Sequence, residues 1–286
     1  MNVLLRWYEG RGASYPWRRA PTPYRVLVSE FMLQQTQAAR VATVYPAFLR
    51  RFPSLRSLAM APRSEVIRAW AGLGYNRRAV ALSEAARIIV ARYGGRVPRP
   101  PEDLRRLPRI GPYTAAAVAS MAYGQPLPAL DVNVRRVVAR ARLGMDPERI
   151  RPGDLLAAAT AWIDAARPGA WNEAAMDLGR EICRPRPRCH LCPIALECGY
   201  PSRDRASPRP PRALRPYEGS SRQLRGQVVA LLRLQPQATL RALSAATRRS
   251  PSQVARAVAS LAKDGIVQAG RGALAGSLGG RVRLAP

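Results

Sequence analysis

The sequence predicts an all-α protein in two parts, a helical region over residues 1–200 and a small domain over residues 222–286. In the first region, segments rich in Ala, Leu and Val are separated by Pro and Gly, and no alternating strand pattern of useful length occurs. Residues 201–221, PSRDRASPRPPRALRPYEGSS, have little to bury and predict a linker. We therefore expect two domains joined by this linker.

Three segments of the first region have the clearest helical pattern. Residues 77–95 carry an apolar face and end in a Gly-Gly pair after Tyr93. Residues 64–74 and 112–124 are similar Ala- and Val-rich runs that end at glycine. Each segment predicts one helix.

The C-terminal domain has the pattern of three helices and a short hairpin. Helices are predicted over 222–234, 239–247 and 250–265, the last with a Ser cap and a Pro at its first position. Two short strands are predicted at 266–270 and 280–286, around a glycine-rich tip. This order resembles a winged helix-turn-helix, whose second and third helices contact DNA. Contact with another protein is the alternative role for such a domain.

The charge balance points to a polyanionic partner. There are 47 basic residues against 18 acidic ones, and Lys263 is the only lysine. Arginine-rich composition explains the shortage of lysine but not the net charge of +29. Nucleic acid is the polyanion that such a surface most often binds.

Membrane insertion and export are not expected. No run of 18 uncharged apolar residues occurs, and the N-terminus lacks a signal-peptide pattern. We expect a bacterial cytoplasmic protein, associated with the nucleoid. A reducing compartment favours a metal over disulfides for clustered cysteines.

All four cysteines lie in one short stretch, CRPRPRCHLCPIALEC, between Cys183 and Cys198. The stretch also holds the only histidine, His190, which we interpret as a solvated loop residue. Four soft thiolates in one loop suit an iron–sulfur cluster or zinc, and two disulfides are the third alternative. The residues concerned are Cys183, Cys189, Cys192 and Cys198.

The stretch LPRIGPYTAAAV at 107–118 predicts a turn between two helices that binds a DNA phosphate. Gly111 leaves backbone N–H groups free at the start of the second helix, which carries Tyr113 and Thr114. The pattern resembles the helix-hairpin-helix motif, with Arg109 in place of its first glycine. Arg109 adds a charge for phosphate, but a positive φ at this position would strain it. A plain turn between helices is the alternative.

Further motifs narrow the resemblance. Asp131 lies in ALDVNVRRVVAR, where the helix-hairpin-helix DNA glycosylases carry their catalytic aspartate; a helix cap is the alternative. YPWRRAPTPYRVLVSEFMLQQTQ, WAGLGYNRRA and WNEAAMDLGREIC resemble segments of the adenine DNA glycosylases of the MutY type. The resemblance covers roughly residues 3–200. It implies a two-lobed, all-α helix-hairpin-helix glycosylase with an iron–sulfur loop at 183–198.

The resemblance assigns two acids to the chemistry. Glu30 lies in the apolar run VLVSEFML, where burial would keep it protonated so that it can protonate N7 of a purine. Asp131 would stay ionised beside the sugar cation, a division of roles that glycosidases need. Tyr113 and Asn133 occupy supporting positions. Without the family motif, Glu30 would be interpreted as a buried structural carboxylate.

The resemblance also assigns the contacts to DNA. A base inside a duplex must be flipped out before it can react. Trp17, Arg18 and Glu173 would form the pocket for that base, while Gln35 and Tyr75 would fill the gap and probe the opposite base. Trp17 and Tyr75 could instead be core aromatics. Asn76 stands where many relatives have a second tyrosine, which weakens the expectation for the opposite base.

The family's cysteine loop binds a [4Fe–4S] cluster, so this cofactor is expected here, with zinc as the alternative. The gaps between cysteines are five, two and five residues, whereas the family usually shows six, two and five. Lyases of the endonuclease III type carry a lysine where this chain has Tyr113, so we expect a glycosylase without lysine-dependent lyase activity. A Nudix-like C-terminal domain, usual in the family, is not found.

The expected function is base excision repair by hydrolysis of the glycosidic bond of adenine mispaired with 8-oxoguanine or guanine. A glycosylase for a deaminated base such as hypoxanthine is one alternative, and a DNA-binding regulator with an iron–sulfur cluster is another. The expected partner is double-stranded DNA with a damaged or mispaired base, bound by a monomer.

Overall fold

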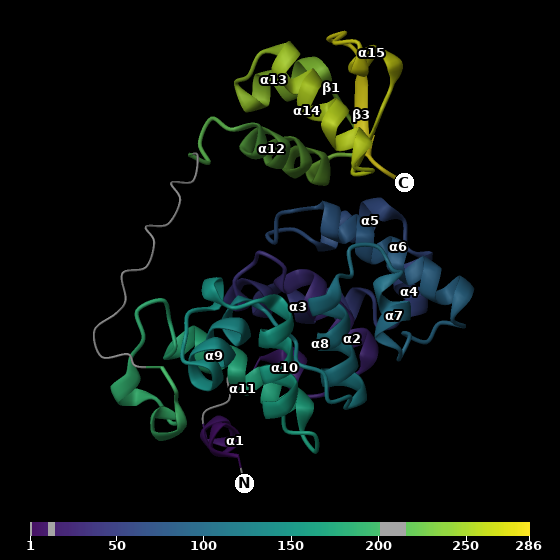
Figure 1. Ribbon diagram of the computed structural model, residues 1–286. Coiled ribbons are helices and arrows are strands. Elements are labelled where there is room, and N and C mark those ends of the chain that lie inside the picture. Colours follow the sequence, from purple (N-terminus) through teal and green to yellow (C-terminus); the bar gives the residue numbers. More distant parts are fainter. Residues whose placement is uncertain (1, 11–14, 201–215) are drawn as a thin grey trace. The chain divides into compact units, whose positions relative to one another are not determined.

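The computed structural model describes residues 2–10, 15–200 and 216–286 (Figure 1). Within these ranges the chain is mainly helical, and its strands lie in the C-terminal segment. The all-α prediction is confirmed. No helix in the described ranges is long and apolar enough to span a bilayer.

The chain divides into two compact units that interleave along the sequence. The first unit combines the N-terminal residues through Glu30 with the segment from Val97 onward, which includes the cysteine loop. The second combines Phe31–Arg96 with the C-terminal domain. Helix α2, Pro23–Leu33, therefore begins in the first unit and ends in the second.

The first unit is built around two packed helices, α9 and α11, with their neighbours α1, α8 and α10 (Figure 1). Its apolar core includes Leu4, Val138 and Trp171, all fully buried. The helices are α1 (Val3–Glu9), α7 (Pro101–Arg105), α8 (Pro112–Tyr123), α9 (Val132–Leu143), α10 (Pro152–Trp162) and α11 (Pro168–Glu181).

Helices α9 and α11 pack closely against each other at Gly179. A Cβ atom at Gly179 would lie only 2.7 Å from Cβ of Asn133. A side chain here would force the two helices apart, because real Cβ atoms do not come so close. The glycine in the sequence WNEAAMDLGREIC thus sets the distance between the start of α9 and the helix that leads into the cysteine loop.

The second unit begins with four helices, α3 (Ala38–Arg51), α4 (Leu55–Met60), α5 (Arg63–Ala69) and α6 (Arg77–Arg92). Helix α6 agrees with the prediction over 77–95, since Gly94 and Gly95 end it with φ of 60° and 81°. The helix predicted over 64–74 is shorter than expected. It ends at Ala69 because the next residues form a turn with positive φ at Gly72 and Gly74.

The C-terminal domain has the element order of a winged helix-turn-helix (Figure 1). The predicted hairpin is corrected in two ways. A third strand, β1, completes the sheet in the order β1-β3-β2, and the glycine-rich tip contains a short helix. The first helix begins at Ser221, inside the predicted linker; residues 201–215 of that linker lie outside the described ranges. The elements are α12 (Ser221–Leu234), β1 (Ala238–Thr239), α13 (Leu240–Thr247), α14 (Pro251–Lys263), β2 (Val267–Ala269), α15 (Arg271–Leu274) and β3 (Arg281–Leu284).

Candidate active site

Glu30 is a buried acid inside α2. It is 4% exposed, and among the described residues its Oε2 atom has no hydrogen-bond partner. Burial raises the pKa of Glu30 to about 7, helped by the charges of Asp131 and Glu173 and opposed by a hydrogen bond from Tyr113. At neutral pH a large fraction of Glu30 is therefore protonated and able to donate a proton, as its apolar flanks predicted.

Asp131 is held by its neighbours at the start of α9. Its Oδ1 atom accepts hydrogen bonds from the backbone N–H groups of Asn133 (2.9 Å) and Val134 (2.7 Å), and its Oδ2 atom accepts one from Nδ2 of Asn133 (2.9 Å). Asp131 is thus the N-cap that was the alternative interpretation. Capping does not exclude chemistry, because these bonds fix the carboxylate at a helix end that favours negative charge.

The environment of Asp131 differs from the sequence expectation in one respect. Burial raises its pKa, while the hydrogen bonds from Val134 and Asn133 and the charge of Arg136 act in the opposite direction. The sequence analysis expects a carboxylate that stays ionised, and in the structure burial disfavours that charged form while these donors favour it. Asn133 donates a hydrogen bond to Asp131, whereas Tyr113 is hydrogen bonded to Glu30.

The loop before Asp131 is fixed by Asn172, a fully buried residue of α11. Its Oδ1 accepts from the backbone N–H of Ala129 (2.7 Å), and its Nδ2 donates to Leu127 O (2.9 Å) and to Oγ of Ser120 (2.8 Å). A buried amide with all these partners is costly to replace. Asn172 therefore fixes the position of the first residues of α9 and of the Asp131 carboxylate that caps it.

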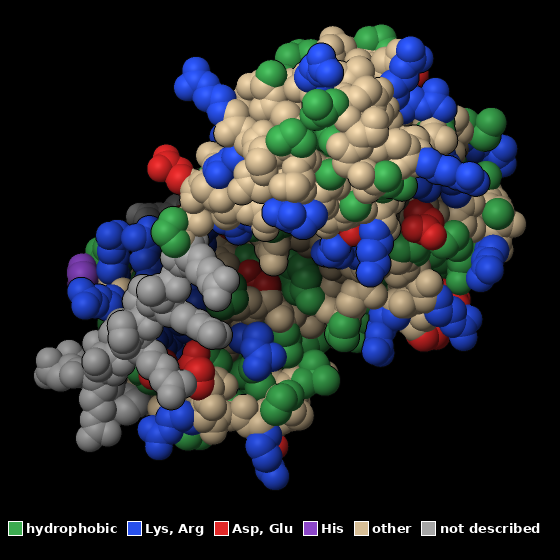
Figure 2. Space-filling model, turned by 90° about the horizontal axis from the view of Figure 1, so that it is seen from above, with side chains coloured by type: hydrophobic (Ala, Val, Ile, Leu, Met, Phe, Trp, Pro, Cys, Tyr) green, Lys and Arg blue, Asp and Glu red, His purple; other side chains and the backbone are tan. Residues whose placement is uncertain are grey.

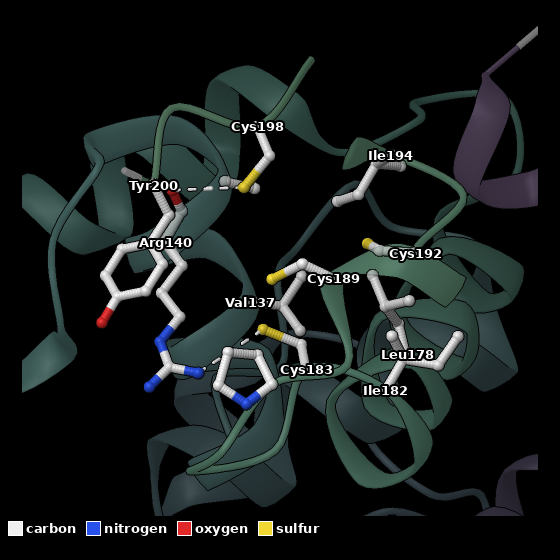
Figure 3. A pocket seen from close by; sticks show the side chains of 12 residues that line it. Val137, Arg140, Leu178, Ile182, Cys183, Cys189, Cys192, Ile194, Cys198 and Tyr200 are labelled. Carbon is white, nitrogen blue, oxygen red and sulfur yellow. Dashed lines mark hydrogen bonds between the residues drawn. The ribbon is translucent and has the colours of Figure 1, made fainter. Parts of the chain in front are cut away.

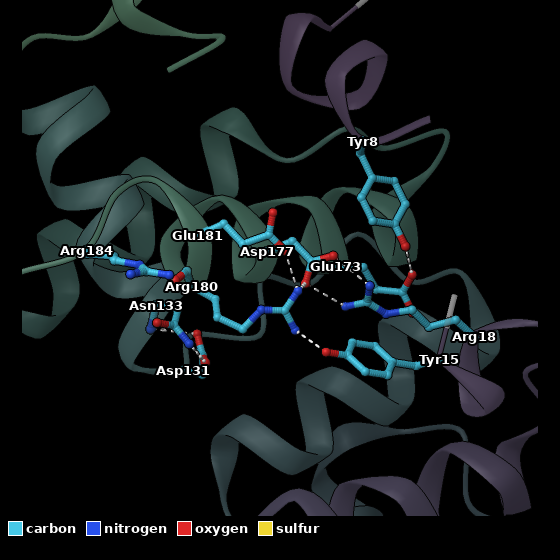
Figure 4. A network of polar contacts seen from close by, with 10 residues as sticks. All are labelled: Tyr8, Tyr15, Arg18, Asp131, Asn133, Glu173, Asp177, Arg180, Glu181 and Arg184. Atoms are coloured by element: carbon cyan, nitrogen blue, oxygen red, sulfur yellow. Dashed lines mark hydrogen bonds and ion pairs between the residues drawn. The ribbon is translucent and has the colours of Figure 1, made fainter. Parts of the chain in front are cut away.

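Arg18 and Glu173, two of the three residues predicted for the base pocket, meet in one polar network (Figure 4). Arg18 donates two hydrogen bonds to Asp177, at 2.7 Å and 3.1 Å, and its Nε lies 3.5 Å from Oε1 of Glu173. The hydroxyl of Tyr8 donates to the other oxygen of Glu173. Burial raises the pKa of Glu173, and the nearby Arg18 lowers it.

Aromatic rings complete this network. Trp17 is 8% exposed and stacks on Tyr15 with ring centroids 4.7 Å apart and an angle of 5° between the planes. The guanidinium of Arg18 lies 5.2 Å from the Tyr15 ring centroid, and Arg180 donates to the Tyr15 hydroxyl at 2.8 Å. The three predicted pocket residues are thus brought together, with Trp17 buried as its alternative interpretation expected.

The hairpin lies between α7 and α8. Arg109 has a φ of 58°, so the strain anticipated for arginine in this position is present. Gly111 is the N-cap of α8 and contributes no side-chain cap, and Tyr113 follows Pro112 in the first turn. The first N–H groups of α8 are therefore available to an anion.

Lys and Arg side chains occur at many places on the face shown in Figure 2, and acidic side chains are fewer there. This distribution agrees with the net charge of +29. A surface of this kind attracts the phosphate backbone of DNA irrespective of sequence.

Gln35 and Tyr75 belong to the second unit, where both have positive φ, 57° and 44°. Tyr75 is 46% exposed, so it is not a core aromatic. Between the two turns lies Arg78, which is 1% exposed. Arg78 donates to the carbonyl oxygens of Met32 (2.7 Å), Gln34 and Leu73 (3.0 Å) and to Oγ1 of Thr36 (2.9 Å). One guanidinium thus fixes both turns.

The four cysteines of the loop line a single cavity (Figure 3). None forms a disulfide, so the disulfide alternative finds no support. The space between the lining side chains has a volume of about 350 Å³, part of which is open to solvent. Apolar side chains from α9 and α11, such as Val137 and Leu178, form its floor. The thiols are Cys183, Cys189, Cys192 and Cys198.

Four thiols around one cavity are a donor set that a cluster of several irons can use. Among the described residues, no three metal-binding side chains are close enough to hold a single ion. A cluster needs only one thiolate for each iron, spread around a cavity, whereas zinc needs all four on one atom. Burial raises the pKa of the Cys183 thiol, and the charge of Arg140, whose guanidinium lies 3.9 Å from Sγ of Cys183, acts in the opposite direction.

Sequence reasoning missed several residues of the site. Arg136 is one: it donates to the carbonyl oxygens of Cys183 (2.6 Å) and Gly179 (2.7 Å) and to Oδ1 of Asn133 (2.9 Å), and so ties the cysteine loop to the Asp131 cap. The others are Tyr8, Tyr15, Arg78, Asn172, Asp177 and Arg180. The one signal available was that Asn172 and Asp177 lie on either side of Glu173, in a motif already singled out.

Comparisons with known proteins agree with this geometry. A family model described as "HhH-GPD superfamily base excision DNA repair protein" matches residues 28–152, a range that includes Glu30, the hairpin and Asp131. The adenine DNA glycosylase of Mycolicibacterium smegmatis is 41% identical over 281 residues, covering 96% of this chain and 95% of the relative.

Solved structures are similar to this chain over about two thirds of its length. A thermostable thymine-DNA glycosylase superposes with a TM-score of 0.65 at 31% identity, covering 69% of this chain and 93% of its own. A non-covalent endonuclease III–DNA complex shares the fold, with a TM-score of 0.58 at 22% identity over 68% of this chain and 91% of its own.

Proposed function

Because the chain belongs to the HhH-GPD superfamily of base excision DNA repair proteins and, within it, to the family of the adenine DNA glycosylases, we propose that it excises adenine from mispaired DNA. The observation that carries the proposal is the pair of acids in the first unit. Glu30 has a pKa of about 7, and the charge of the nearby Asp131 contributes to raising it. An acid and a carboxylate with different environments are what hydrolysis of a glycosidic bond needs.

In the proposed reaction Glu30 is the general acid. Its free Oε2 atom is the oxygen without a partner in the described structure, so it can carry the proton that passes to N7 of the adenine. The leaving base then departs as a neutral molecule and not as an anion. Tyr113, which hydrogen bonds to the same carboxyl group, holds it in place.

Asp131 faces the charge that develops on the sugar. As the bond to adenine breaks, the deoxyribose gains oxocarbenium character, and the carboxylate of Asp131 stabilises it. The donors Asn133 and Val134 already occupy Oδ1, so the electrostatic role needs no rearrangement of the cap. Water then adds to the sugar and leaves an abasic site.

Strand cleavage by a lysine is not part of the proposal. A lyase of that kind needs an amine that forms a Schiff base with the sugar. The single lysine, Lys263, belongs to the C-terminal domain, and Tyr113 occupies the hairpin position. The proposed product is an abasic site in an intact strand.

The remaining site residues are assigned to the DNA. The network of Trp17, Arg18 and Glu173 would receive the flipped adenine, since a ring stack and a buried carboxylate can contact both the face and the edge of a base. Arg109, Gly111 and Thr114 lie at the hairpin that would hold a phosphate. Gln35 and Tyr75 would fill the gap.

The four thiolates of the cysteine loop would hold a [4Fe–4S] cluster. Bound there, the cluster would cross-link the loop and stiffen its arginines for contact with DNA. Arg136 and Arg140 bind carbonyl oxygens of the same loop, at Cys183 and Arg184, and so support it from α9. The test is iron analysis of the purified protein together with its visible spectrum, in which such a cluster absorbs near roughly 400 nm. One zinc ion per chain in place of iron would contradict the assignment.

Substrate choice is tested with a panel of duplexes. The purified protein is incubated with A:8-oxoguanine, A:G, hypoxanthine:T, U:G and T:G duplexes and then treated with alkali. Release of adenine opposite 8-oxoguanine or guanine, lost in Asp131→Asn by about 10²–10³-fold, supports the proposal. Asn still caps a helix, so α9 is retained in this variant. Release of hypoxanthine alone would favour the deaminated-base alternative, and tight sequence-specific binding without excision would favour a regulator.

A further inference from the structure

One arginine of the C-terminal domain bridges both ends of the turn that carries Tyr75. The Nε atom of Arg233 donates to Ile67 O (3.1 Å), and a terminal nitrogen donates to Oδ1 of Asn76 (2.9 Å). Ile67 belongs to α5 and Asn76 precedes α6, so the bridge spans residues 67–76. Arg233 itself comes from the last turn of α12, 157 residues after Asn76.

Each accepting group is one that a helix end leaves available. Ile67 lies in the last turn of α5, where backbone carbonyl oxygens lack partners within the helix. Asn76 is the N-cap of α6, and its side chain makes no capping bond there. A single guanidinium has the several donors in fixed geometry that this double contact needs.

The bridge is part of a larger contact between the C-terminal domain and α5–α6. Asp264, at the end of α14, forms ion pairs with Arg77 (2.6 Å) and with Arg225. Ile67 is fully buried in the same apolar core as Val228, Leu232 and other residues of the C-terminal domain. The domain is therefore packed on the two helices that flank the Tyr75 turn.

The turn needs such support. Tyr75 has a φ of 44°, a conformation that costs a residue with a side chain about 1 kcal/mol or more. Its ring is half exposed and gains little from burial. The buried Arg78 donates hydrogen bonds to Leu73 O and Gly74 O within the turn. Arg233 donates to the residues at its two ends, of which Ile67 is the first.

We propose that Arg233 is a positioning residue through which the C-terminal domain holds the Tyr75 turn in its DNA-probing conformation. The part of this inference that concerns DNA rests on the proposed function. It assigns a task to a domain that lies outside residues 28–152, the range matched by the family model, and it makes Asn76 an acceptor for a hydrogen bond from that domain.

Hydrogen exchange tests the physical contact without any reaction. The full chain is compared with Arg233→Met, which keeps much of the side-chain length but removes both hydrogen bonds. Exchange of the backbone amides within residues 70–78 should accelerate by about tenfold, because two charge-assisted bonds are lost. Arg222→Met, which removes an exposed arginine of the same helix, is the matched control and should leave this peptide unchanged.

A variant of Asn76, the side chain that accepts from Arg233, tests whether the effect of Arg233 depends on this hydrogen bond. Asn76→Ala should accelerate exchange in the same peptide, and the double variant with Arg233→Met should add little, since both changes remove the same bond. Exchange in Arg233→Met equal to that of the unaltered protein overturns the inference. If the effects of the two substitutions add, the Arg233–Asn76 hydrogen bond is not what supports the turn.

Excision tests the functional part. With saturating protein, we expect Arg233→Met to excise adenine opposite 8-oxoguanine within about twofold of the normal rate, while its preference over adenine opposite cytosine falls about tenfold. An unchanged preference despite faster exchange would overturn the probing role. Absence of excision by the unaltered protein would instead contradict the proposed function, and the exchange result would still decide the contact.

Discussion

The acid pair of the first unit and the Tyr75 turn of the second are built on opposite principles. At Glu30 a buried oxygen has no hydrogen-bond partner among the described residues, and the pKa is raised to about 7. At the Tyr75 turn, carbonyl oxygens that point inward are bound by Arg78, and both ends are bound by Arg233. A reacting group must remain available for a proton transfer, whereas a group that probes DNA must remain fixed.

The difference also lies in where the energetic cost appears. In the first unit the cost is electrostatic, because burial removes water from the Glu30 carboxyl group and disfavours its charged form. In the second region it is conformational, because Gln35 and Tyr75 adopt positive φ. Four substitutions, at Glu30, Arg78, Asp131 and Arg109, test the electrostatic and the conformational cost separately.

Replacing the buried acid should have the largest effect. Glu30→Gln keeps the shape of the side chain but removes the proton donor, so excision of adenine should slow by about 10²–10⁴-fold in single-turnover assays. The same variant should be more stable than the unaltered protein above pH 7. The difference between an unfolded pKa of 4.5 and a folded pKa of about 7 corresponds to about 3 kcal/mol.

The sign of that stability effect follows from the raised pKa. Below pH 4.5 Glu30 is neutral in both the folded and unfolded states, so the variant and the unaltered protein should be equally stable. As pH rises from 4.5 to about 7, the unfolded state releases the Glu30 proton while the folded state keeps it, so the folded state loses stability until Glu30 ionises there as well. Denaturant melts at pH 4 and pH 8 check this, and equal stability at pH 8 would contradict a buried, perturbed Glu30.

Removing the arginine between the two turns should mainly affect folding. Arg78→Met leaves buried carbonyl oxygens at Met32 and Leu73 without donors, so the free energy of unfolding should fall by about 3 kcal/mol. Arg92→Met, an exposed arginine on the same helix, should change it by less than about 0.5 kcal/mol. A small loss in Arg78→Met would mean that the turns do not depend on it.

The pH dependence of excision should follow the titration of Glu30. The active form is protonated, so the single-turnover rate should fall by about tenfold between pH 6 and pH 8. Asp131→Asn should be slower at every pH and should still slow as pH rises, with a lower midpoint because the charge of Asp131 no longer raises the pKa of Glu30. A rate that rises with pH would exclude Glu30 as the general acid.

The smallest effect is expected at the hairpin, where conformational cost appears in the first unit as well. Arg109→Gly removes the strain of a φ of 58° and should stabilise the protein by about 1 kcal/mol in denaturant melts. It also removes one charge for a phosphate, so the salt dependence of DNA binding should decrease by about one ion. A destabilised variant would show that Arg109 contributes a contact that outweighs its strain.

Local sequence was sufficient for the helices, their caps and several site residues. The glycine pair ended α6, Ser250 capped α14, and Asp131 capped α9, because each signal acts within a few residues of chain. The four cysteines were recognisable as one ligand set for the same reason. The apolar run around Glu30 was enough to predict its raised pKa, since burial is the largest cause of that shift.

The short strand β1 and the early end of α5 escaped prediction for a different reason. β1 has two residues and exists through its pairing with β3, over forty positions later, so no local pattern marks it. Helix α5 ends at Ala69 although the apolar pattern continues, because the turn after it is held by Arg78 and Arg233.

What the sequence by itself determined, then, is the helical class, several of the helices, the burial of Glu30, the cap at Asp131 and the group of four thiols. Only the tertiary structure decided which distant side chains complete them: Tyr8 on Glu173, 165 residues apart, Arg18 on Asp177, 159 apart, and Arg233 on Asn76, 157 apart. Hydrogen bonds and ion pairs over such separations leave no periodicity in the chain, because they depend on where packed helices bring two side chains together.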